Sequence, residues 1–395
     1  MELDNINPSV LHVKPSAMRK FDHDISVDPD IIKLTLGEPN FDVPEHIKAA
    51  AVKAITTNCS HYPYYWGFEE LRQAASTYYR DKFGYHYSAD EIVVSVGATE
   101  ALASTVKTLF KPGDAVIIPT PAYPLYGALL TLNQLKPIFI DTSDSGFVLT
   151  PEKVQKAIAD HPESTIRGLI LTDPNNPTGV AYTQDQIAAL APVLKDNHIW
   201  VISDEIYGEL TYGQDHYTIS KYLPEQTIIT NGLSKSHAMT GWRLGLVFGP
   251  HPFIDEIAKT HQYTVTAAAS LVQYAAVEAL THGQNDAAVM KAEYQKRRDY
   301  VVTHMTAAGF DVVHPGGAFY VFAKIPAALH MDSWQFVKTL AKEYHIGLMP
   351  GDPFGDNDYI RISYAASDEA LAAAMKAIKQ MVADKSRNVS KTAER

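Results

Sequence analysis

Seven short apolar runs recur between residues 90 and 250 of this 395-residue chain, and longer segments separate them. The runs are EIVVSV, DAVIIP, KPIFI, GLILT, IWVIS, TIIT and LGLVF. Runs this short, rich in Val and Ile and bounded by Gly, Pro, Asp or Asn, are typical of buried strands in a parallel sheet. Their alternation with helical patterns predicts an α/β domain with helices on both faces of a mostly parallel, seven-stranded sheet.

The sequence pattern changes after about residue 290. A helical pattern is followed there by the short runs FDVVHP and AFYVFAKI and then by the helical stretch SWQFVKTLAKEYH. A closing helix from Asp368 to about Asp384 would place Leu371, Met375 and Ile378 on one apolar stripe. We therefore expect an N-terminal arm with part of a small domain over residues 1–45 and a large domain over 46–289. A smaller α+β domain would follow over 290–385, and a frayed polar tail over 386–395.

Composition and charge exclude several classes of protein. A net charge of -11 argues against nucleic-acid binding, which depends on clustered cations. The single cysteine, Cys59, allows neither an intrachain disulfide nor a cysteine-rich metal site, and we expect no metal. No basic-then-apolar leader and no membrane-spanning apolar run occurs, so we expect a cytoplasmic protein without membrane contact. No dinucleotide fingerprint, Walker-type loop or zinc-protease motif is present.

Lys235 lies in the stretch TIITNGLSKSHAMTGWRLGLVFG, eight residues before Arg243 and thirty-one residues after Asp204. A lysine after an apolar run can form an imine with an aldehyde, because desolvation favours its neutral form. An arginine nearby can bind a phosphate through its planar fork. Pyridoxal phosphate carries both groups, and its ring nitrogen would need an anionic partner such as Asp204.

Four more polar segments follow predicted strands or begin predicted helices. GATEALASTVKTL offers a helix N-terminus for a phosphate, and DPNNPTG could hold the amide of Asn176 between prolines. PAYPLY places Tyr123 and Tyr126 at a strand end, where a ring could stack on a flat heterocycle. Arg361 in DYIRISYAA could clamp a carboxylate. Taken singly, each has a plainer interpretation: a capped surface helix, a turn, a core aromatic and an edge arginine.

Together these segments resemble the fold-type I pyridoxal-phosphate aminotransferases of the class I/II group. The resemblance covers nearly the whole chain, through LTLGEPNFDVP, YPYYWGFEELR, GATEA, PAYPLY, NNPTG, SDEIY, SKSHAMTGWRLG and YIRISYA. Among the branches of that family, the sequence is most similar to bacterial aromatic-amino-acid aminotransferases. The N-acetyl-diaminopimelate aminotransferases are a near neighbour.

The resemblance implies a role for each matching residue around the cofactor ring. Lys235 would bind the cofactor covalently and later carry the substrate proton, while Asp204 would pair with the ring nitrogen. Tyr207 and Asn176 would hydrogen-bond the ring oxygen, and Tyr123 would stack on the ring.

The resemblance also implies residues for the substrate and for the phosphate. Arg361, with Gly37 and Asn176, would receive the substrate carboxylate. One departure is Gly232, which stands three residues before the lysine, where some relatives carry a phosphate-binding serine. The implied phosphate ligands are Ala98, Thr99, Ser234, Arg243 and, reaching across from the partner subunit of a homodimer, Tyr62.

These roles imply ping-pong transfer of an amino group from an aromatic or broad-range amino acid to a 2-oxo acid, with 2-oxoglutarate as the expected acceptor. Strict dicarboxylate specificity is disfavoured, because residues 251–290 contain no arginine and Thr99 stands where some members carry a lysine. The aromatic run of residues 62–68 could either wall an aromatic pocket or pack a dimer interface.

Two other functions remain open, and a third is disfavoured. One is an N-acetyl-diaminopimelate aminotransferase of lysine biosynthesis, and another is a carbon-sulfur β-lyase on the same fold. A pyridoxal-phosphate sensing module of a transcription regulator would need an attached DNA-binding domain, whereas this acidic chain begins with the aminotransferase-like arm.

Overall fold

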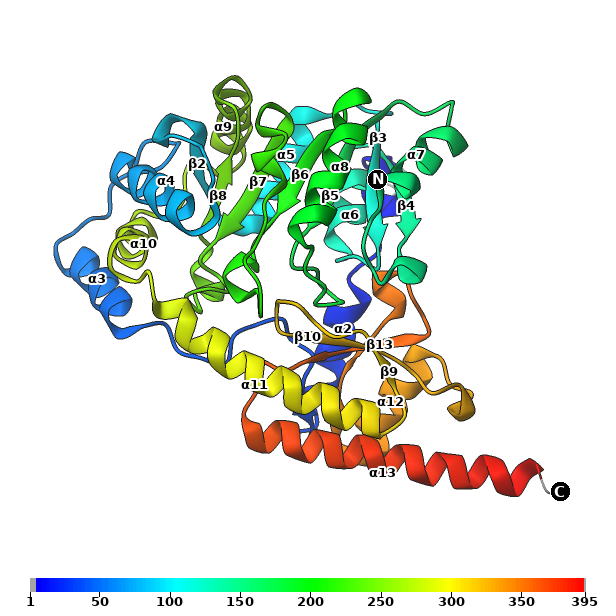
Figure 1. Cartoon of the computed structure of the whole chain (residues 1–395). Helices are drawn as coiled ribbons and strands as arrows, with labels where there is room; N and C mark the ends of the chain where they lie inside the picture. The colour runs from blue at the N-terminus through cyan, green and yellow to red at the C-terminus, as the bar shows by residue number, and fades with distance from the viewer. Residues whose placement is uncertain (1–4, 394–395) are drawn as a thin grey trace.

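The computed structural model describes residues 5–393, with side chains described as far as residue 387. Its centre is a seven-stranded sheet with the order β2-β8-β7-β6-β5-β3-β4 (Figure 1). The seven runs identified in the sequence form these seven strands, and the predicted α/β fold is confirmed. The bounds are β2 Ile92–Ser95, β3 Ala115–Thr120, β4 Lys136–Asp141, β5 Ile166–Thr172, β6 Trp200–Asp204, β7 Thr227–Gly232 and β8 Gly245–Phe248.

Strand direction is uniform except at β8, which pairs antiparallel with both β2 and β7. The pairs β3·β4, β3·β5, β5·β6 and β6·β7 are all parallel. The carboxyl ends of β5, β6 and β7 therefore meet at one edge of the sheet. Ligands of open α/β sheets bind beyond such ends, which places Asp204 and the segment after β7 at the expected position.

Helices cover both faces of the sheet because successive strand residues point in opposite directions. Val116 and Ile170 pack on α5 (Gly97–Leu109) and α6 (Leu125–Leu132). Ile117 and Leu171 belong to the cluster on the opposite face, with α7 (Pro151–Asp160) and α8 (Gln184–Asp196). The β2–β8 end is covered by α3 (Glu45–Thr56), α4 (Glu69–Phe83), α9 (His251–Val265) and α10 (Ser270–His282).

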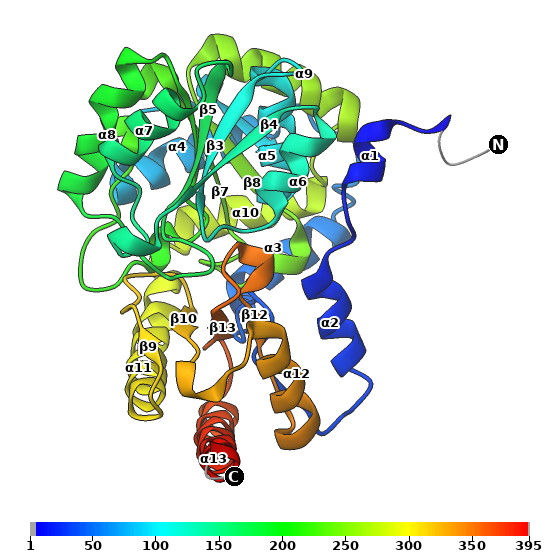
Figure 2. The ribbon, with the colours of Figure 1, turned by 90° about the vertical axis from the view of Figure 1, so that its right-hand side faces the viewer.

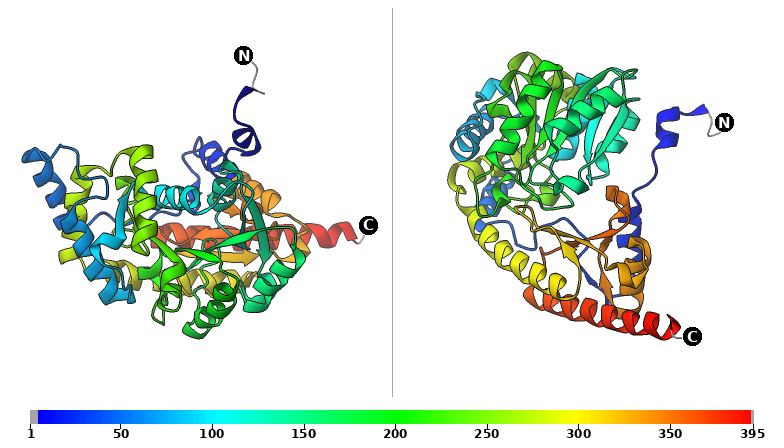
Figure 3. Two further views of the ribbon diagram at one scale, coloured as in Figure 1. Left: turned by 90° about the horizontal axis from the view of Figure 1, so that it is seen from above. Right: turned by 45° about the vertical axis from the view of Figure 1, so that its right-hand side comes forward.

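A second, antiparallel sheet lies below the first and has the order β12-β13-β10-β9. It packs with α11, α12 and α13, and the last of these runs beside α11 along the lower edge of the molecule (Figure 3). The predicted frayed tail over residues 386–395 stays a prediction; among the described residues, α13 continues past Asp384 to Ala393. The bounds are β9 Asp311–Val312, β10 Tyr320–Lys324, β12 Met349–Pro350, β13 Tyr359–Ser363, α11 Asp286–Ala307, α12 Ser333–Tyr344 and α13 Asp368–Ala393.

The N-terminal segment packs mainly on the smaller domain, where it contributes to a separate two-stranded sheet. Helix α1 (Pro8–His12) lies against α6, and α2 (Ala17–Ile25) descends beside α12 (Figure 2). Phe21 of α2 packs edge-on against Trp334 of α12, with 5.8 Å between ring centroids. The following β1 (Ile32–Lys33) pairs in parallel with β11 (Ile346–Gly347). The arm thus contacts the large domain through α1 and α6, while α2 and β1 contact the smaller domain.

Within residues 5–393, no helix is both long enough and apolar enough to cross a membrane. The same described part of the chain contains no group of three or more His, Cys, Asp or Glu residues placed to hold a metal ion.

Candidate active site

Asp204 ends β6 and is only 5% exposed. Its carboxylate accepts a hydrogen bond from the Tyr126 hydroxyl at 2.8 Å and one from the Ile206 backbone N–H at 3.4 Å. Burial raises the pKa of Asp204 to about 6, while the Tyr126 hydrogen bond acts in the opposite direction. The group is therefore mostly a carboxylate at neutral pH, and a cationic partner would favour that form further.

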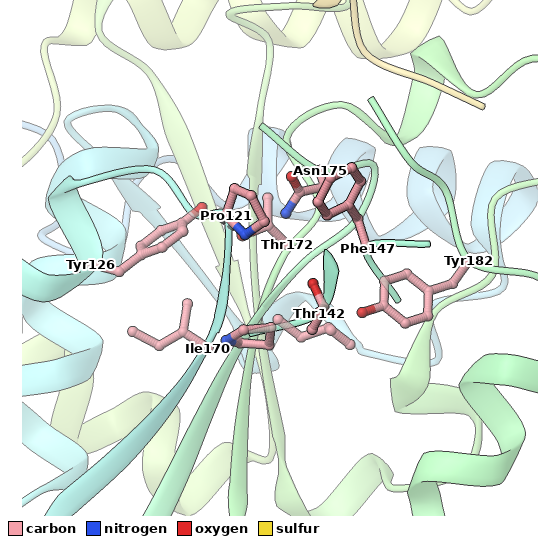
Figure 4. A pocket seen from close by; sticks show the side chains of 10 residues that line it. Pro121, Tyr126, Thr142, Phe147, Ile170, Thr172, Asn175 and Tyr182 are labelled. Atoms are coloured by element: carbon pink, nitrogen blue, oxygen red, sulfur yellow. Dashed lines mark hydrogen bonds between the residues drawn. The ribbon is translucent and has the colours of Figure 1, made fainter. Parts of the chain in front are cut away.

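A buried hydrogen-bond chain fixes the orientation of this carboxylate. The Thr172 hydroxyl donates to Tyr126 Oη at 2.7 Å, and Tyr126 in turn donates to Asp204. Thr172 and Tyr126 both line a small cavity of about 10 Å³, which Figure 4 shows from close by. That volume is about the space of one water molecule. Asp204 itself is outside this cavity and is buried by the chain around it.

Lys235 follows β7, and its Nζ donates a hydrogen bond to the Gly37 carbonyl at 2.6 Å. The same Nζ lies 5.9 Å from the ring centroids of both Tyr207 and Phe319. Burial lowers the pKa of Lys235 to about 8; nearby Glu38 acts in the opposite direction, while Arg243 adds to the lowering. A sizeable fraction of this amine is therefore neutral near neutral pH, as a nucleophile requires.

This pKa predicts how the protein freed of its cofactor regains it. Only the neutral amine can attack an aldehyde, so the rate constant for pyridoxal-phosphate incorporation should rise roughly tenfold per pH unit below pH 8 and level off above it. The rate is followed by the absorbance change on mixing. A rate that stays flat between about pH 6 and pH 9 would contradict the lowered pKa.

Arg361 lies on β13 and is 4% exposed. Its guanidinium carbon lies 4.4 Å from the Tyr320 ring centroid and 4.8 Å from that of Phe354. One terminal nitrogen donates to Asn176 Oδ1 at 2.9 Å, and the other donates to the Thr35 carbonyl at 2.6 Å. Its Nε is buried without a hydrogen-bond partner among the described residues. A buried donor left free in this way suits an incoming carboxylate.

A hydrogen bond between hydroxyls joins Tyr207, which follows β6, to Tyr320 on β10. Their hydroxyls lie 2.7 Å apart, and burial raises the pKa of Tyr207 well above its ordinary value, so it remains a phenol. A Cβ at Gly37 would come within 2.0 Å of the Tyr320 hydroxyl, so only glycine fits at that position beside the ring. The Gly37 carbonyl is thereby held close enough to accept the hydrogen bond from Lys235.

The opposite end of the site is built around the first turn of α5. Gly97 has a φ of +79°, and a Cβ there would lie 2.5 Å from Nη2 of Arg243. The absent side chain lets Arg243 approach the free amide groups of the helix N-terminus, and together they form a cradle for an anion. A steric clash also explains why glycine stands at position 232, where some relatives carry a serine. A Cβ there would lie 2.8 Å from the Leu244 carbonyl.

These groups share one cavity of about 1070 Å³ at the edge of the large sheet. Eleven of the twelve predicted site residues lie on its wall, although their individual roles stay predictions. The exception is Tyr62, which is 90% exposed on the surface away from the cavity of its own chain. The eleven are Gly37, Ala98, Thr99, Tyr123, Asn176, Asp204, Tyr207, Ser234, Lys235, Arg243 and Arg361.

The predicted aromatic pocket wall is not found within the single chain. None of the aromatic residues between positions 62 and 68 lines the cavity. Trp66 is instead buried against Val93 and Ile254, and Tyr64 is 57% exposed. The alternative use of this run, at an interface between subunits, stays a prediction.

Several residues that line the cavity are not predicted as site residues from the sequence. Tyr126 was recognised only as an alternative to Tyr123, and Tyr320 only as part of an apolar strand. Arg19 carried no signal, since it lies in a short amphipathic helix far from every recognised motif. Its position on the cavity wall is known only from the folded structure, in which distant chain segments lie together.

A buried amine, a buried carboxylate and a cradle for an anion at the strand ends of this sheet define the pyridoxal-phosphate transferases of fold-type I. Comparison with known families gives the same result: the family described as aminotransferase class I and II matches residues 29–378. The chain belongs to this family, whose members use pyridoxal phosphate, and it is an aminotransferase acting on small amino and 2-oxo acids.

The similar proteins differ in their substrates. The chain is 41% identical to a probable N-acetyl-LL-diaminopimelate aminotransferase of Bacillus subtilis, over 93% of each sequence. It superposes on an aspartate aminotransferase from Thermus thermophilus solved with maleate, with a TM-score of 0.91, 32% identity and coverage of 95% of this chain and 99% of the other. For an aromatic aminotransferase from Pyrococcus horikoshii the TM-score is 0.87, with 33% identity and coverage of 93% and 100%.

The residues on the cavity wall fit the cofactor of the family. The cradle of Gly97 and Arg243 would bind its phosphate, and the carboxylate of Asp204 would accept a hydrogen bond from its protonated ring nitrogen. The amine of Lys235 lies in the same cavity and could bind its aldehyde.

Proposed function

We propose that this protein transfers the amino group of aromatic or broad-range L-amino acids to a 2-oxo acid, with 2-oxoglutarate as acceptor, in a ping-pong reaction. The observation that carries the proposal is the gathering of Lys235, Asp204 and Arg361 on one cavity wall. These three supply the amine, the anion and the carboxylate clamp that amino transfer needs.

When bound, pyridoxal phosphate supplies an electron-withdrawing ring that stabilises negative charge at the α-carbon of the substrate. Asp204 would hold the ring nitrogen in its protonated, cationic form. Lys235, once its amine is freed by the incoming amino group, would take the α-proton of the substrate and deliver it to the cofactor carbon that had carried the aldehyde. Arg361 would orient the substrate through its α-carboxylate, and Asn176 would keep that guanidinium in place.

The wall of the cavity supports a substrate with a large side chain. Besides the charged groups, the apolar residues Met18, Leu36, Met349 and Pro353 line it. Ligand pockets typically occupy about 300–1,000 Å³, so this cavity of about 1070 Å³ can hold both a cofactor and an aromatic amino acid. The likeness to the aromatic aminotransferase of Pyrococcus horikoshii supports the same substrate class.

A second candidate donor is an N-acylated diamino acid. The 41% identity to the probable N-acetyl-LL-diaminopimelate aminotransferase favours it. The same cavity could accommodate a long acylated side chain, and the reaction at the α-carbon would use the same residues.

We also propose that the active enzyme is a homodimer in which Tyr62 reaches the phosphate of the partner subunit. Tyr62 and Tyr263 are 90% and 88% exposed, and an exposed tyrosine is a common anchor of a protein interface. The exposed apolar residues Val52 and Ile55 on α3 extend the same kind of surface.

A panel of half-reactions tests the proposed donor. The holoenzyme is mixed with single amino acids, and loss of its cofactor absorbance is followed without acceptor. We expect Phe, Tyr and Trp to react rapidly. Failure of all three, together with rapid reaction of N-acetyl-LL-diaminopimelate, would favour the second candidate. Release of pyruvate and ammonia from cystathionine would instead indicate a carbon-sulfur lyase.

A further inference from the structure

Tyr320 lies on the cavity wall, yet the proposed reaction assigns it no step. It belongs to β10 of the smaller sheet, and its side chain is fully buried. Its ring contacts Arg361 and its hydroxyl contacts Tyr207, so it lies between the proposed carboxylate clamp and a predicted ligand of the cofactor ring. Because a buried hydroxyl needs a hydrogen-bond partner, the placement of this hydroxyl constrains its partner as well.

The pairing of β10 with β13 places the Tyr320 ring beside Arg361. Phe322 is directly opposite Arg361 in the register of the two strands, and Tyr320 lies two residues along on the same face. The guanidinium carbon is 4.4 Å from the centroid of the Tyr320 ring. Burial raises the pKa of Tyr320, and the Arg361 cation acts in the opposite direction because it favours negative charge on the phenol oxygen.

The surroundings of the Tyr320 hydroxyl leave its proton one acceptor among residues 5–387. The hydroxyl is packed against Gly37, where a Cβ would lie 2.0 Å from it. Its hydrogen-bond partner in this described part of the chain is the Tyr207 hydroxyl, at 2.7 Å. A proton that pointed anywhere else would be buried without a partner, which is unfavourable. The geometry therefore makes Tyr320 the donor of this hydrogen bond.

The acidity of the two phenols favours the same direction. Burial raises the pKa of Tyr207 well above its ordinary value, whereas Arg361 limits the rise for Tyr320. A nearby cation also makes a phenol a stronger donor, in the same way that charge strengthens other hydrogen bonds. A hydroxyl that accepts from Tyr320 carries its own proton on another side, and Tyr207 lies on the cavity wall. The Tyr207 proton is therefore available to a ligand in the cavity.

We propose that Tyr320 is a positioning residue whose hydroxyl donates to Tyr207 Oη and thereby directs the Tyr207 proton toward the ring oxygen of the bound cofactor. This inference rests on the proposed function and on the role that the family resemblance implies for Tyr207. Hydrogen bonds in a chain strengthen one another, so donation by Tyr320 also makes Tyr207 a better donor. Tyr320 acts through Tyr207 and not on the reacting atoms.

Tyr320→Phe tests the proposal, because it removes the hydroxyl and keeps the ring against Arg361. The readout is the visible absorbance of the resting holoenzyme during a pH titration. It follows the proton that the linkage between Lys235 and the cofactor shares with the ring oxygen. A donor at that oxygen weakens its hold on the proton. The midpoint of the titration should therefore rise by about 0.5 in Tyr320→Phe, which corresponds to roughly threefold tighter proton binding and fits the loss of one supporting hydrogen bond.

Tyr207→Phe is the reference, since it removes the donor itself and should raise the midpoint further. The double variant Tyr207→Phe/Tyr320→Phe should titrate like Tyr207→Phe alone, because a residue that acts through Tyr207 has no effect in its absence. The matched control is Tyr212→Phe. Tyr212 is also a buried tyrosine, and it donates to the Ala318 carbonyl, but it does not line the cavity. Its substitution should leave the midpoint unchanged.

Three results would overturn the proposal: an unchanged midpoint in Tyr320→Phe, a rise of the same size in Tyr212→Phe, or additive rises in the double variant. An unchanged midpoint in Tyr207→Phe would also overturn it, since Tyr207 would then not donate to the ring oxygen. The titration uses no substrate. Failure of the aromatic donors would therefore not affect it, and the two proposals can fail separately.

Discussion

Replacing Lys235 by alanine should reduce kcat by roughly 10³-fold or more, because the variant loses both the attacking amine and the proton carrier. The loss should be the same with every amino acid, since Lys235 acts at the α-carbon that all donors share. Steady-state kinetics with two donors of different size measures it. The Asp204 carboxylate and the Arg243 cradle remain in the variant, so pyridoxal phosphate should still bind, without a covalent bond.

Lys221→Ala is the matched control for this variant, because Lys221 is exposed on the same domain and does not line the cavity. It should show wild-type kcat and the same thermal unfolding midpoint. Near-normal repeated turnover in Lys235→Ala would contradict the mechanism. Partial recovery on adding small primary amines would support it, since these could replace the missing proton carrier.

Arg361→Lys should lower kcat/KM by roughly 10²-fold for all amino donors alike. An ammonium group cannot reproduce the paired hydrogen bonds of the guanidinium, and it would also leave Asn176 Oδ1 and the Thr35 carbonyl with a poorer donor. The measurement is kcat/KM with phenylalanine and with glutamate. The ratio of the two values should stay close to that of the wild type.

A matched control is Arg167→Lys, since Arg167 also lies on a strand, β5, but is exposed and away from the cavity. Its kinetics should not change. If Arg361→Lys impaired only one of the two donors, the residue would be recognising a side chain, and its assignment to the α-carboxylate would be wrong.

Much of the fold follows from local sequence patterns. A parallel strand is apolar where both of its faces are covered, so the buried parts of β5 and β6 are visible as GLILT and IWVIS. Their polar ends are visible for the same reason: a carboxylate such as Asp204 cannot lie inside the sheet and therefore marks its edge. The position of Lys235 just after β7 follows from the same argument.

Other features depend on contacts between distant residues, and local patterns do not carry that information. The reversed direction of β8 leaves no trace in LGLVF, since a short buried strand has the same composition in either direction. β1 has only two residues, and its pairing with Ile346 depends on closing a loop of more than three hundred residues. The link between Tyr207 and Tyr320 likewise requires the two sheets to be in contact.

The aromatic and amide surroundings of Arg361 have a consequence for selectivity. Tyr320 and Phe354 enclose the guanidinium, and Asn176 and Thr35 fix its rotamer before any ligand arrives. Immobilising a long side chain costs about 0.5–1.5 kcal/mol on association, and here that loss of freedom occurs during folding. Every amino acid would thus gain from an anchor that has already lost its rotamer freedom before the ligand binds.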